Sequence, residues 1–190
     1  MVFYTVVLIS LFSACIGSFL NVCIDRLPRG RSVIVPRSYC PRCGRTLKWF
    51  HNIPLFSFIF LKGRCAFCQE KIGGRQLFVE LLTIGLALST FAHFGLTPSF
   101  FLYFLFLICP LIVVSFIDLQ HLIIPDLLTL PGIPVGVIVS LLLSPEGYGT
   151  ALKESLFGIL VGGGFLFLVG FLSEKIRGQE GLGGGDVKLA

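Results

Sequence analysis

The sequence predicts an all-α polytopic membrane protein, a helical bundle with a small cytoplasmic zinc-binding loop domain between its first and second spans. Of the 190 residues, 55% are hydrophobic and 13% are charged, and a water-soluble domain carries about twice that charged fraction. The mean hydropathy is +0.92. The basic residues are clustered, since 11 of the 15 Lys and Arg lie between Arg26 and Arg75. Such clustering between apolar runs indicates a cytoplasmic loop rather than a nucleic-acid-binding surface.

Five apolar runs are about long enough to cross the hydrocarbon core of a bilayer. Because the basic loop follows the first run, the positive-inside rule predicts that the N-terminus is outside and the loop inside. Pro110 predicts a kink in the third run, and Pro131 and Pro134 predict that the fourth run starts broken or unwound. The predicted spans are residues 2–20, 77–94, 99–117, 127–143 and 154–172.

The inner ends of the first two spans carry small and charged residues. Gly17 and Ser18 allow the first helix to approach a neighbouring helix closely. Glu80 lies near the start of the second span, within about one or two turns of Arg75 or Lys71. We interpret Glu80 as a paired charge at the membrane interface in preference to a functional group.

Four cysteines in the basic loop have the spacing of metal ligands. Cys40 and Cys43 form one C-x-x-C pair, Cys65 and Cys68 form a second, and Gly44 permits the tight turn that such sites use. In a reducing compartment, paired C-x-x-C motifs indicate zinc rather than disulfides, four unrelated thiols being the alternative. Four sulfur ligands leave no coordination position for water, so the predicted zinc is structural.

One carboxylate stands at the end of the longest uncharged stretch of the chain. Residues 81–117 contain no Asp, Glu, Lys or Arg, and Asp118 follows them directly. A carboxylate at the edge of the membrane is costly, and the macrodipole at a helix C-terminus disfavours it further. Asp118 is therefore a candidate for chemistry. Asp126 follows Pro125 and opens the next apolar run, where it can cap a helix N-terminus.

A second candidate carboxylate follows a run of glycines near the end of the chain. Asp186 comes after Gly183 and Gly185, which let a peptide backbone or water approach closely, although Asp186 is equally placed to cap a following helix. Counting spans places Asp186 on the same face of the membrane as Asp118. Two such carboxylates sharing a proton can act as base toward water and as acid toward a scissile amide.

The order of these features resembles the type IV prepilin peptidase family, the membrane aspartyl proteases that process pilin and pseudopilin precursors. Residues 17–28 look like the family's G-S-F-L-N-V-x-x-x-R-L-P opening, and the two cysteine pairs, with residues 52–55 between them, are similar to its cytoplasmic domain. Asp118 with residues 125–126 resembles the first aspartate motif, and residues 183–186 resemble the G-x-G-D motif. The resemblance covers nearly the whole chain.

The resemblance implies roles for individual residues. Asp118 and Asp186 are expected to be catalytic, with Gly183, Gly185 and Asp126 supporting the active site. Zinc ligation by the four cysteines is also expected. The expected domains are residues 1–25 as the first span, residues 26–76 as the cytoplasmic zinc-binding domain, and residues 77–190 as the transmembrane aspartyl protease core.

The resemblance also implies an activity and a location. The expected enzyme is an endopeptidase that removes the leader peptide from type IV prepilins or pseudopilins and N-methylates the new N-terminus with S-adenosylmethionine. Its partners would be those substrates and the lipid bilayer, with no nucleic acid. It would lie in the inner membrane with its active site at the cytoplasmic face.

Two features depart from the family pattern. Relatives tend to read R-Y-P before the second span, where this chain has Arg75, Gln76 and Leu77. Relatives also usually continue from the G-x-G-D motif into further spans, whereas this chain stops at Ala190, so we expect it to stop before the family's last spans.

Two other classes of protein share some of these features. Broken helices and membrane carboxylates also mark transporters and channels, but the predicted topology places Asp118 and Asp186 on one face. A non-catalytic zinc-bearing membrane anchor accounts for the basic loop and leaves Asp118 without a role. No glycine-rich strand–helix motif for S-adenosylmethionine occurs in the loop.

Overall fold

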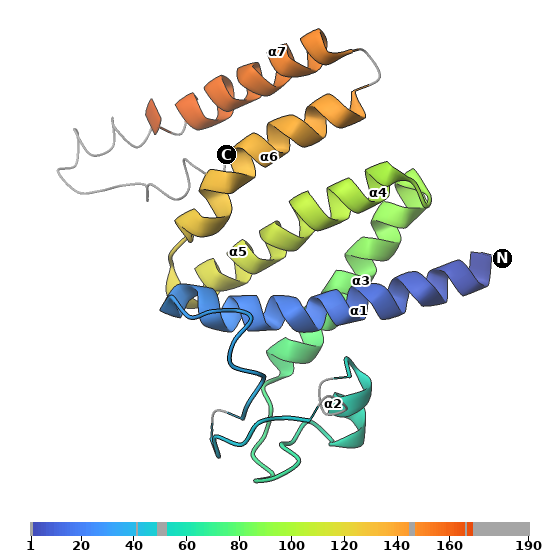
Figure 1. Ribbon diagram of the computed structural model, residues 1–190, viewed down its shortest axis with the longest axis vertical. Helices are drawn as coiled ribbons and strands as arrows, with labels where there is room; N and C mark the ends of the chain where they lie inside the picture. The colour runs from blue at the N-terminus through green and yellow to red at the C-terminus, as the bar shows by residue number, and fades with distance from the viewer. Residues whose placement is uncertain (1, 41, 49–52, 145–146, 166, 169–190) are drawn as a thin grey trace. The chain divides into compact units, whose positions relative to one another are not determined.

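The regular elements of the protein are helices among the residues that the computed structural model describes, which are 2–40, 42–48, 53–144, 147–165 and 167–168 (Figure 1). No strand occurs among these residues, apart from two isolated bridges in the loop. The chain divides into two compact units, Met1–Phe116 and Ile117–Ala190. The elements are α1 (Val2–Arg26), η1 (Leu27–Arg29), α2 (Phe56–Phe60), α3 (Gly74–Phe94), α4 (Pro98–Tyr103), η3 (Phe104–Ile108), α5 (Cys109–His121), α6 (Asp126–Leu143), α7 (Tyr148–Gly158) and η4 (Ile159–Gly163).

Four of the described helical segments are long and apolar enough to cross a membrane. They match the first four predicted spans, so the predicted multi-pass helical fold is confirmed. The fifth predicted span, residues 154–172, begins in α7 and runs through the π-helical turn η4 into residues outside the described part of the chain, so it stays a prediction. The four segments are Val2–Arg29, Gly74–Phe94, Pro98–His121 and Asp126–Leu143.

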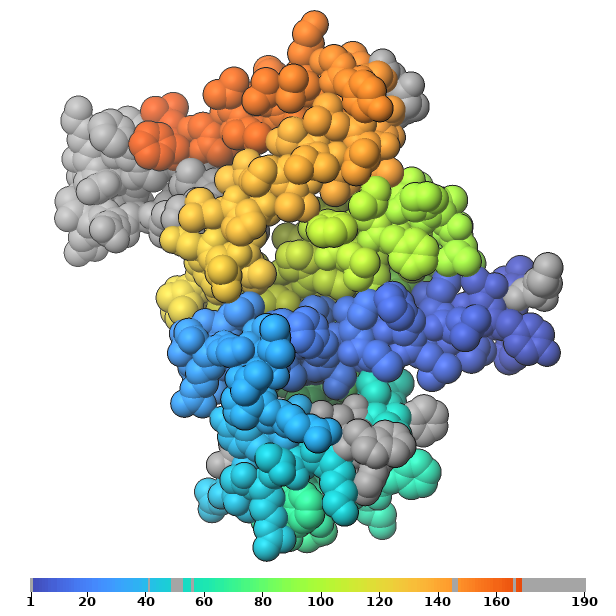
Figure 2. All heavy atoms as spheres, viewed as in Figure 1, coloured from blue at the N-terminus to red at the C-terminus, as the bar shows by residue number. Residues whose placement is uncertain are grey.

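Many large apolar side chains along these helices are exposed. In the space-filling view the side chains of α1 lie open along one face of the molecule (Figure 2). A soluble monomer rarely exposes continuous apolar surface of this kind, whereas a bilayer covers it without cost. Examples from four helical segments are Leu8 (66%), Leu81 (51%), Leu111 (41%) and Leu142 (64%).

The helices α1 and α3 pack together through small side chains. A Cβ atom on Gly17 would lie 2.9 Å from the Cα of Glu80 and 3.1 Å from the Oγ1 of Thr83, so the two backbones nearly touch there. Ser13 and Thr83 donate their hydroxyl hydrogens, each over 2.7 Å, to carbonyls four residues earlier in their own helices. Both hydroxyls are thereby satisfied without water, as a lipid environment requires. The predicted close contact at Gly17 is confirmed.

The segment α4–η3–α5 returns beside α3 as one helical rod. At the turn, the ring of Phe94 stacks on that of Tyr103 with centroids 4.7 Å apart, and the Thr97 side chain caps α4 by accepting the N–H of Phe100. The π-helical turn η3 directly precedes Cys109 and Pro110. Proline has no N–H and its ring clashes with the carbonyl four residues earlier, which accounts for a π-helical turn just before Pro110. The kink predicted at Pro110 stays a prediction.

The prediction that the fourth span starts broken is wrong. The helix α6 is continuous from Asp126 to Leu143, with Pro131 and Pro134 inside it. Each proline removes only one backbone hydrogen bond. An apolar run that cannot bond its backbone to lipid keeps all of its remaining internal bonds, which favours the helix over an unwound segment.

Candidate functional site

The two cysteine pairs lie in turns of the same construction. In the first turn, the N–H of Cys40 donates to the carbonyl of Arg45 over 3.0 Å, and the N–H of Gly44 donates back to the carbonyl of Cys40 over 2.9 Å. In the second turn, the N–H of Cys65 donates to the carbonyl of Glu70 over 2.8 Å. An isolated antiparallel bridge flanks each turn. Both turns therefore share one backbone hydrogen-bond pattern.

The residue after each pair has a positive φ angle. Gly44 has φ +68° and Gln69 has φ +58°. The φ angle of Gly44 supports the predicted need for glycine at this turn, because glycine adopts the left-handed region without steric cost. In the second turn a glutamine takes the same conformation, and its N–H donates to the carbonyl of Cys65 over 3.0 Å.

The four thiols come together in one cluster. Their Sγ atoms all lie within 4.8 Å of one another, and those of Cys40 and Cys68 are 3.8 Å apart. A tetrahedral site with Zn–S bonds of about 2.3 Å places its sulfurs about 3.8 Å apart. The cluster predicted from the spacing is therefore present and has the dimensions of a metal site. Its members are Cys40, Cys43, Cys65 and Cys68.

Backbone hydrogen bonds prepare one of these thiols for metal binding. Donation from the N–H groups of Cys68 and Phe67 lowers the pKa of the Cys65 thiol to about 7, and the Phe67 nitrogen lies 3.5 Å from the sulfur. Because the thiolate is the form that ligates metals, these N–H groups favour the ligating state at neutral pH.

Glu80 connects the loop domain to the membrane helices. Only 8% of this residue is exposed, and its Oε2 accepts the backbone N–H of Leu55 over 2.8 Å, while the hydroxyl of Ser18 also bonds its carboxylate. Arg75 instead forms an ion pair with Asp25 over 2.8 Å. The interpretation of Glu80 as an interfacial charge paired with Arg75 or Lys71 is thus wrong, because packing at Gly17 buries the carboxylate, which bonds Leu55 and Ser18 instead.

Sequence reasoning missed this structural role of Glu80, although one signal was available. A carboxylate inside an apolar run must find polar partners within the protein. The sequence contains no information about which loop residue supplies the partner, since Leu55 offers only its backbone.

The first predicted catalytic residue, Asp118, lies in the last turn of α5. The helix continues to His121, and the carbonyl of Asp118 accepts the N–H of Leu122 over 2.8 Å. The Asp118 side chain is partly buried. Its placement at a helix C-terminus agrees with the position argued from the sequence, where the macrodipole disfavours a negative charge.

Asp126 lies across the short link from Asp118. It is the first residue of α6, and the N-cap position is taken by Pro125, which has no side-chain capping bond. Asp126 is exposed, and its charge in the first turn is favourable toward the helix dipole without occupying the cap itself. Asp186, Gly183 and Gly185 lie outside the described residues, so their predicted roles stay predictions.

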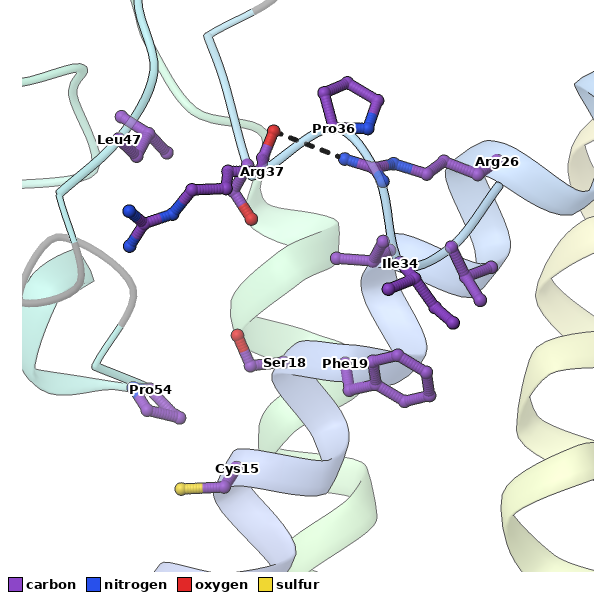
Figure 3. A pocket seen from close by; sticks show the side chains of 12 residues that line it. Cys15, Ser18, Phe19, Arg26, Ile34, Pro36, Arg37, Leu47 and Pro54 are labelled. Carbon is purple, nitrogen blue, oxygen red and sulfur yellow. Dashed lines mark hydrogen bonds between the residues drawn. The ribbon is translucent and has the colours of Figure 1, made fainter. Parts of the chain in front are cut away.

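A cavity of about 360 Å³ lies between α1 and the loop domain (Figure 3). Side chains of α1 form one wall, including those of Ser18 and Phe19, and loop residues around Ile34 and Arg37 form the opposite wall. The guanidinium of Arg26 bridges the walls by donating to the carbonyl of Arg37 over 3.5 Å. No sequence motif predicted this cavity, because it arises where the loop folds back over α1.

Comparisons with known proteins cover both halves of the chain. The family model described as the bacterial peptidase A24 N-terminal domain matches residues 11–94. The model described as the type IV leader peptidase family matches residues 105–190. No solved structure matches the chain.

Several similar proteins carry the name prepilin leader peptidase/N-methyltransferase. That of Myxococcus xanthus is 38% identical over 179 residues, covering 92% of this chain and 51% of the relative. That of Dichelobacter nodosus is 35% identical over 210 residues, covering 95% of this chain and 71% of the relative. That of Aeromonas salmonicida is 38% identical over 208 residues, covering 96% of this chain and 69% of the relative. The chain thus spans about half to 70% of these relatives' lengths, and it belongs to the prepilin leader peptidase/N-methyltransferase family.

Proposed function

We propose that the protein is a membrane aspartyl endopeptidase that removes the leader peptide from type IV prepilins or pseudopilins and N-methylates the new N-terminus with S-adenosylmethionine. The observation that carries the proposal is that the two family models match consecutive parts of the chain, residues 11–94 and 105–190. The relatives' shared name pairs a leader peptidase with an N-methyltransferase.

Peptide cleavage in this proposal uses Asp118 and Asp186. Amide hydrolysis needs a base to take a proton from water and an acid to protonate the leaving nitrogen. Two carboxylates that share one proton supply both functions. The position of Asp118 at the end of α5 supports its role, because helix stability does not account for a carboxylate there. Gly183, Gly185 and Asp126 would support the site.

The cysteine cluster fits a structural zinc ion. Its sulfur atoms all lie within 4.8 Å of one another, with one pair 3.8 Å apart. Four thiolates complete the coordination of zinc, so the metal would hold the loop domain together without activating water. A loop with few regular elements, here one short helix and two turns, gains stability from such a metal.

The proposed location is the inner membrane, with the N-terminus outside and the active site at the cytoplasmic face. The clustering of basic residues between the first two spans supports this orientation. In domain terms, residues 1–25 would be the first span, 26–76 the cytoplasmic zinc-binding domain and 77–190 the protease core.

Incubating the detergent-solubilised protein with a prepilin, with and without S-adenosylmethionine, tests the proposal. Mass spectrometry of the product should show leader removal under both conditions and a methyl group on the new N-terminus only with S-adenosylmethionine. An Asp118→Asn variant is the matched control and should leave the prepilin uncut. A wild-type protein that leaves the prepilin intact would count against the peptidase proposal.

A further inference from the structure

We propose that the cavity between α1 and the loop domain binds the headgroup of an anionic phospholipid, with the acyl chains of the lipid lying along the exposed face of α1. This site does not depend on the proposed enzymatic function. The cavity lies wholly within the unit Met1–Phe116, so its walls belong to one compact body. It lies beside the end of α1 from which the basic loop leaves, and the end of a membrane-spanning helix is the depth at which lipid headgroups are found.

The cavity carries positive charge that no acidic side chain of its lining offsets. Arg26 and Arg37 are among the described residues that line it, and none of these is an Asp or Glu. The guanidinium of Arg26 donates to the carbonyl of Ser32 over 3.0 Å and to that of Arg37 over 3.5 Å, and these bonds hold it in place without neutralising its charge. The carboxylate of Asp25 is paired with Arg75 over 2.8 Å. The charge of the cavity therefore favours an anionic ligand.

The guanidinium of Arg37 is available to bind such an anion. Arg37 is exposed, and its side chain extends toward Leu47 (Figure 3). Among the residues that the structure describes, no hydrogen bond or ion pair joins this guanidinium to another group. Its N–H groups can bond two oxygens of a phosphate at once, which is the geometry that guanidinium groups favour. Basic pockets at the inner ends of membrane helices bind phospholipid headgroups through such contacts.

An apolar stripe of α1 leads along the membrane span into the cavity. Its members follow one another at the spacing of three or four residues that defines one helix face, and they are Leu8, Phe12, Cys15, Phe19 and Val22. The first two and Phe19 are 66%, 47% and 51% exposed, and Cys15, Phe19 and Val22 line the cavity. From Cys15 to Arg26 the helix rises about 16 Å, which is about the depth of one leaflet of a hydrocarbon core of about 30 Å. An acyl chain on this stripe would thus place its headgroup at the two arginines.

The opposite wall of the cavity also offers apolar side chains. Ile34 and Val35 of the loop are 83% and 67% exposed, and Ile34 lies beside the ring of Phe19 (Figure 3). Exposed aliphatic side chains in a basic loop are unfavourable in water and favourable at a membrane surface, where lipid chains cover them and basic side chains meet the phosphates. The cavity thus combines apolar walls with two arginines, which are complementary to the acyl chains and to the phosphate of an anionic phospholipid.

Native mass spectrometry of the full chain in detergent tests the site, with phosphatidylglycerol and phosphatidylcholine of identical acyl chains as the probes. The wild type should bind one phosphatidylglycerol about tenfold or more tightly than phosphatidylcholine, because phosphatidylcholine carries a cation of its own beside the phosphate. Arg37→Gln should weaken phosphatidylglycerol binding about tenfold and so remove this preference. Arg64→Gln, at an exposed arginine of the same loop domain outside the cavity lining, should bind as the wild type does. The thermal unfolding midpoints of both variants should match that of the wild type.

A second pair of variants tests the apolar stripe. Phe19→Ala should weaken the binding of phosphatidylglycerol about fivefold, because it removes apolar area that an acyl chain would cover. Phe78→Ala makes the same exchange in α3, at a residue that is 57% exposed and outside the cavity lining, and should leave binding unchanged. Glycerol 3-phosphate has the phosphate without the acyl chains and should bind about a hundredfold more weakly than phosphatidylglycerol.

Four results would overturn the lipid site. Equal binding of the two lipids by the wild type, or an affinity for phosphatidylglycerol that Arg37→Gln leaves unchanged, would show that the cavity does not select an anionic headgroup. Glycerol 3-phosphate that binds as tightly as phosphatidylglycerol would identify a site for a free anion. Displacement of phosphatidylglycerol by an equimolar prepilin leader peptide would identify a peptide-binding surface.

Discussion

The carboxylate of Glu80 in α3 holds the backbone N–H of Leu55 at the start of α2, with 2.8 Å between Oε2 and the nitrogen. Leu55 has φ +60°, a conformation that leucine rarely adopts and that costs on the order of 1–3 kcal/mol. The hydrogen bond that this N–H donates to a buried carboxylate offsets part of this cost. This bond joins the loop domain to α3, beside the bonds that Arg26 of α1 makes to the loop.

Replacing Glu80 should loosen the loop domain. Glu80→Ala leaves the Leu55 N–H without its acceptor and should lower the free energy of unfolding by about 1–3 kcal/mol, whereas Glu80→Gln keeps an acceptor and should lose less. Limited trypsin digestion at Lys48 and Lys62 should become faster in Glu80→Ala. The exposed Glu154 supplies the control, since Glu154→Ala should leave the digestion rate unchanged. Equal digestion of the two alanine variants would contradict the anchoring role.

Enlarging Gly17 should separate α1 from α3. A Cβ there would lie 2.9 Å from the Glu80 Cα, so Gly17→Ala should destabilise the protein by about 1–3 kcal/mol through overpacking. Gly85→Ala in α3 is the matched control, because nothing lies within 4 Å of its Cβ position and alanine has the higher helix propensity. Thermal unfolding in detergent should show a lower midpoint only for Gly17→Ala. A midpoint equal to that of Gly85→Ala would exclude the close contact.

The cysteine cluster should hold one zinc ion per chain. Elemental analysis of purified protein should find it, and a Cys40→Ser, Cys43→Ser variant should lose it together with protease resistance of the loop. Cys15→Ser and Cys23→Ser change thiols outside the cluster and should keep the metal. Full zinc occupancy in the double variant would refute the site.

Acid should release the same metal, because protons compete with zinc for thiolates. The pKa of the Cys65 thiol, lowered to about 7 by backbone N–H donors, lies below its ordinary value. In the metal-free protein the Cys65 thiolate therefore stabilises the fold fully only above the ordinary pKa of a cysteine. This stabilisation is lost as the pH falls through about 7. Zinc uptake by chelator-treated protein should accordingly weaken from pH 8 to about 6, and a pH-independent uptake would contradict thiolate ligation.

Substituting either predicted catalytic aspartate should reduce prepilin cleavage far more than substituting Asp126. In the prepilin-cleavage assay, Asp118→Asn and Asp186→Asn should each lose cleavage by several orders of magnitude while retaining zinc, since each removes one half of an acid–base pair. Asp126→Asn should lose much less, because its charge lies in the first turn of α6 and acts there on the helix. Near-normal cleavage by the first two variants would exclude the aspartyl mechanism. If Asp126→Asn is the inactive variant, the first catalytic aspartate has been assigned to the wrong position.

The sequence by itself determined the features that depend only on residues close together in the chain. The length and apolarity of the runs predicted four described spans, because crossing a bilayer requires only enough apolar residues in a helix. The paired C-x-x-C spacing predicted the thiol cluster, because each pair needs only a tight turn. The relation of Asp118 to Asp186 stays a prediction, since Asp186 lies outside the described residues.

Tertiary structure decided what depends on partners distant in the chain. The local sequence does not show that Glu80 accepts a hydrogen bond from Leu55 instead of pairing with Arg75. This partner depends on how closely Gly17 lets α1 approach α3. The cavity beside Ser18 likewise exists only once the loop folds over α1. The continuity of α6 through Pro131 and Pro134 departs from local propensity, because a backbone without water keeps every hydrogen bond it can form within its own helix.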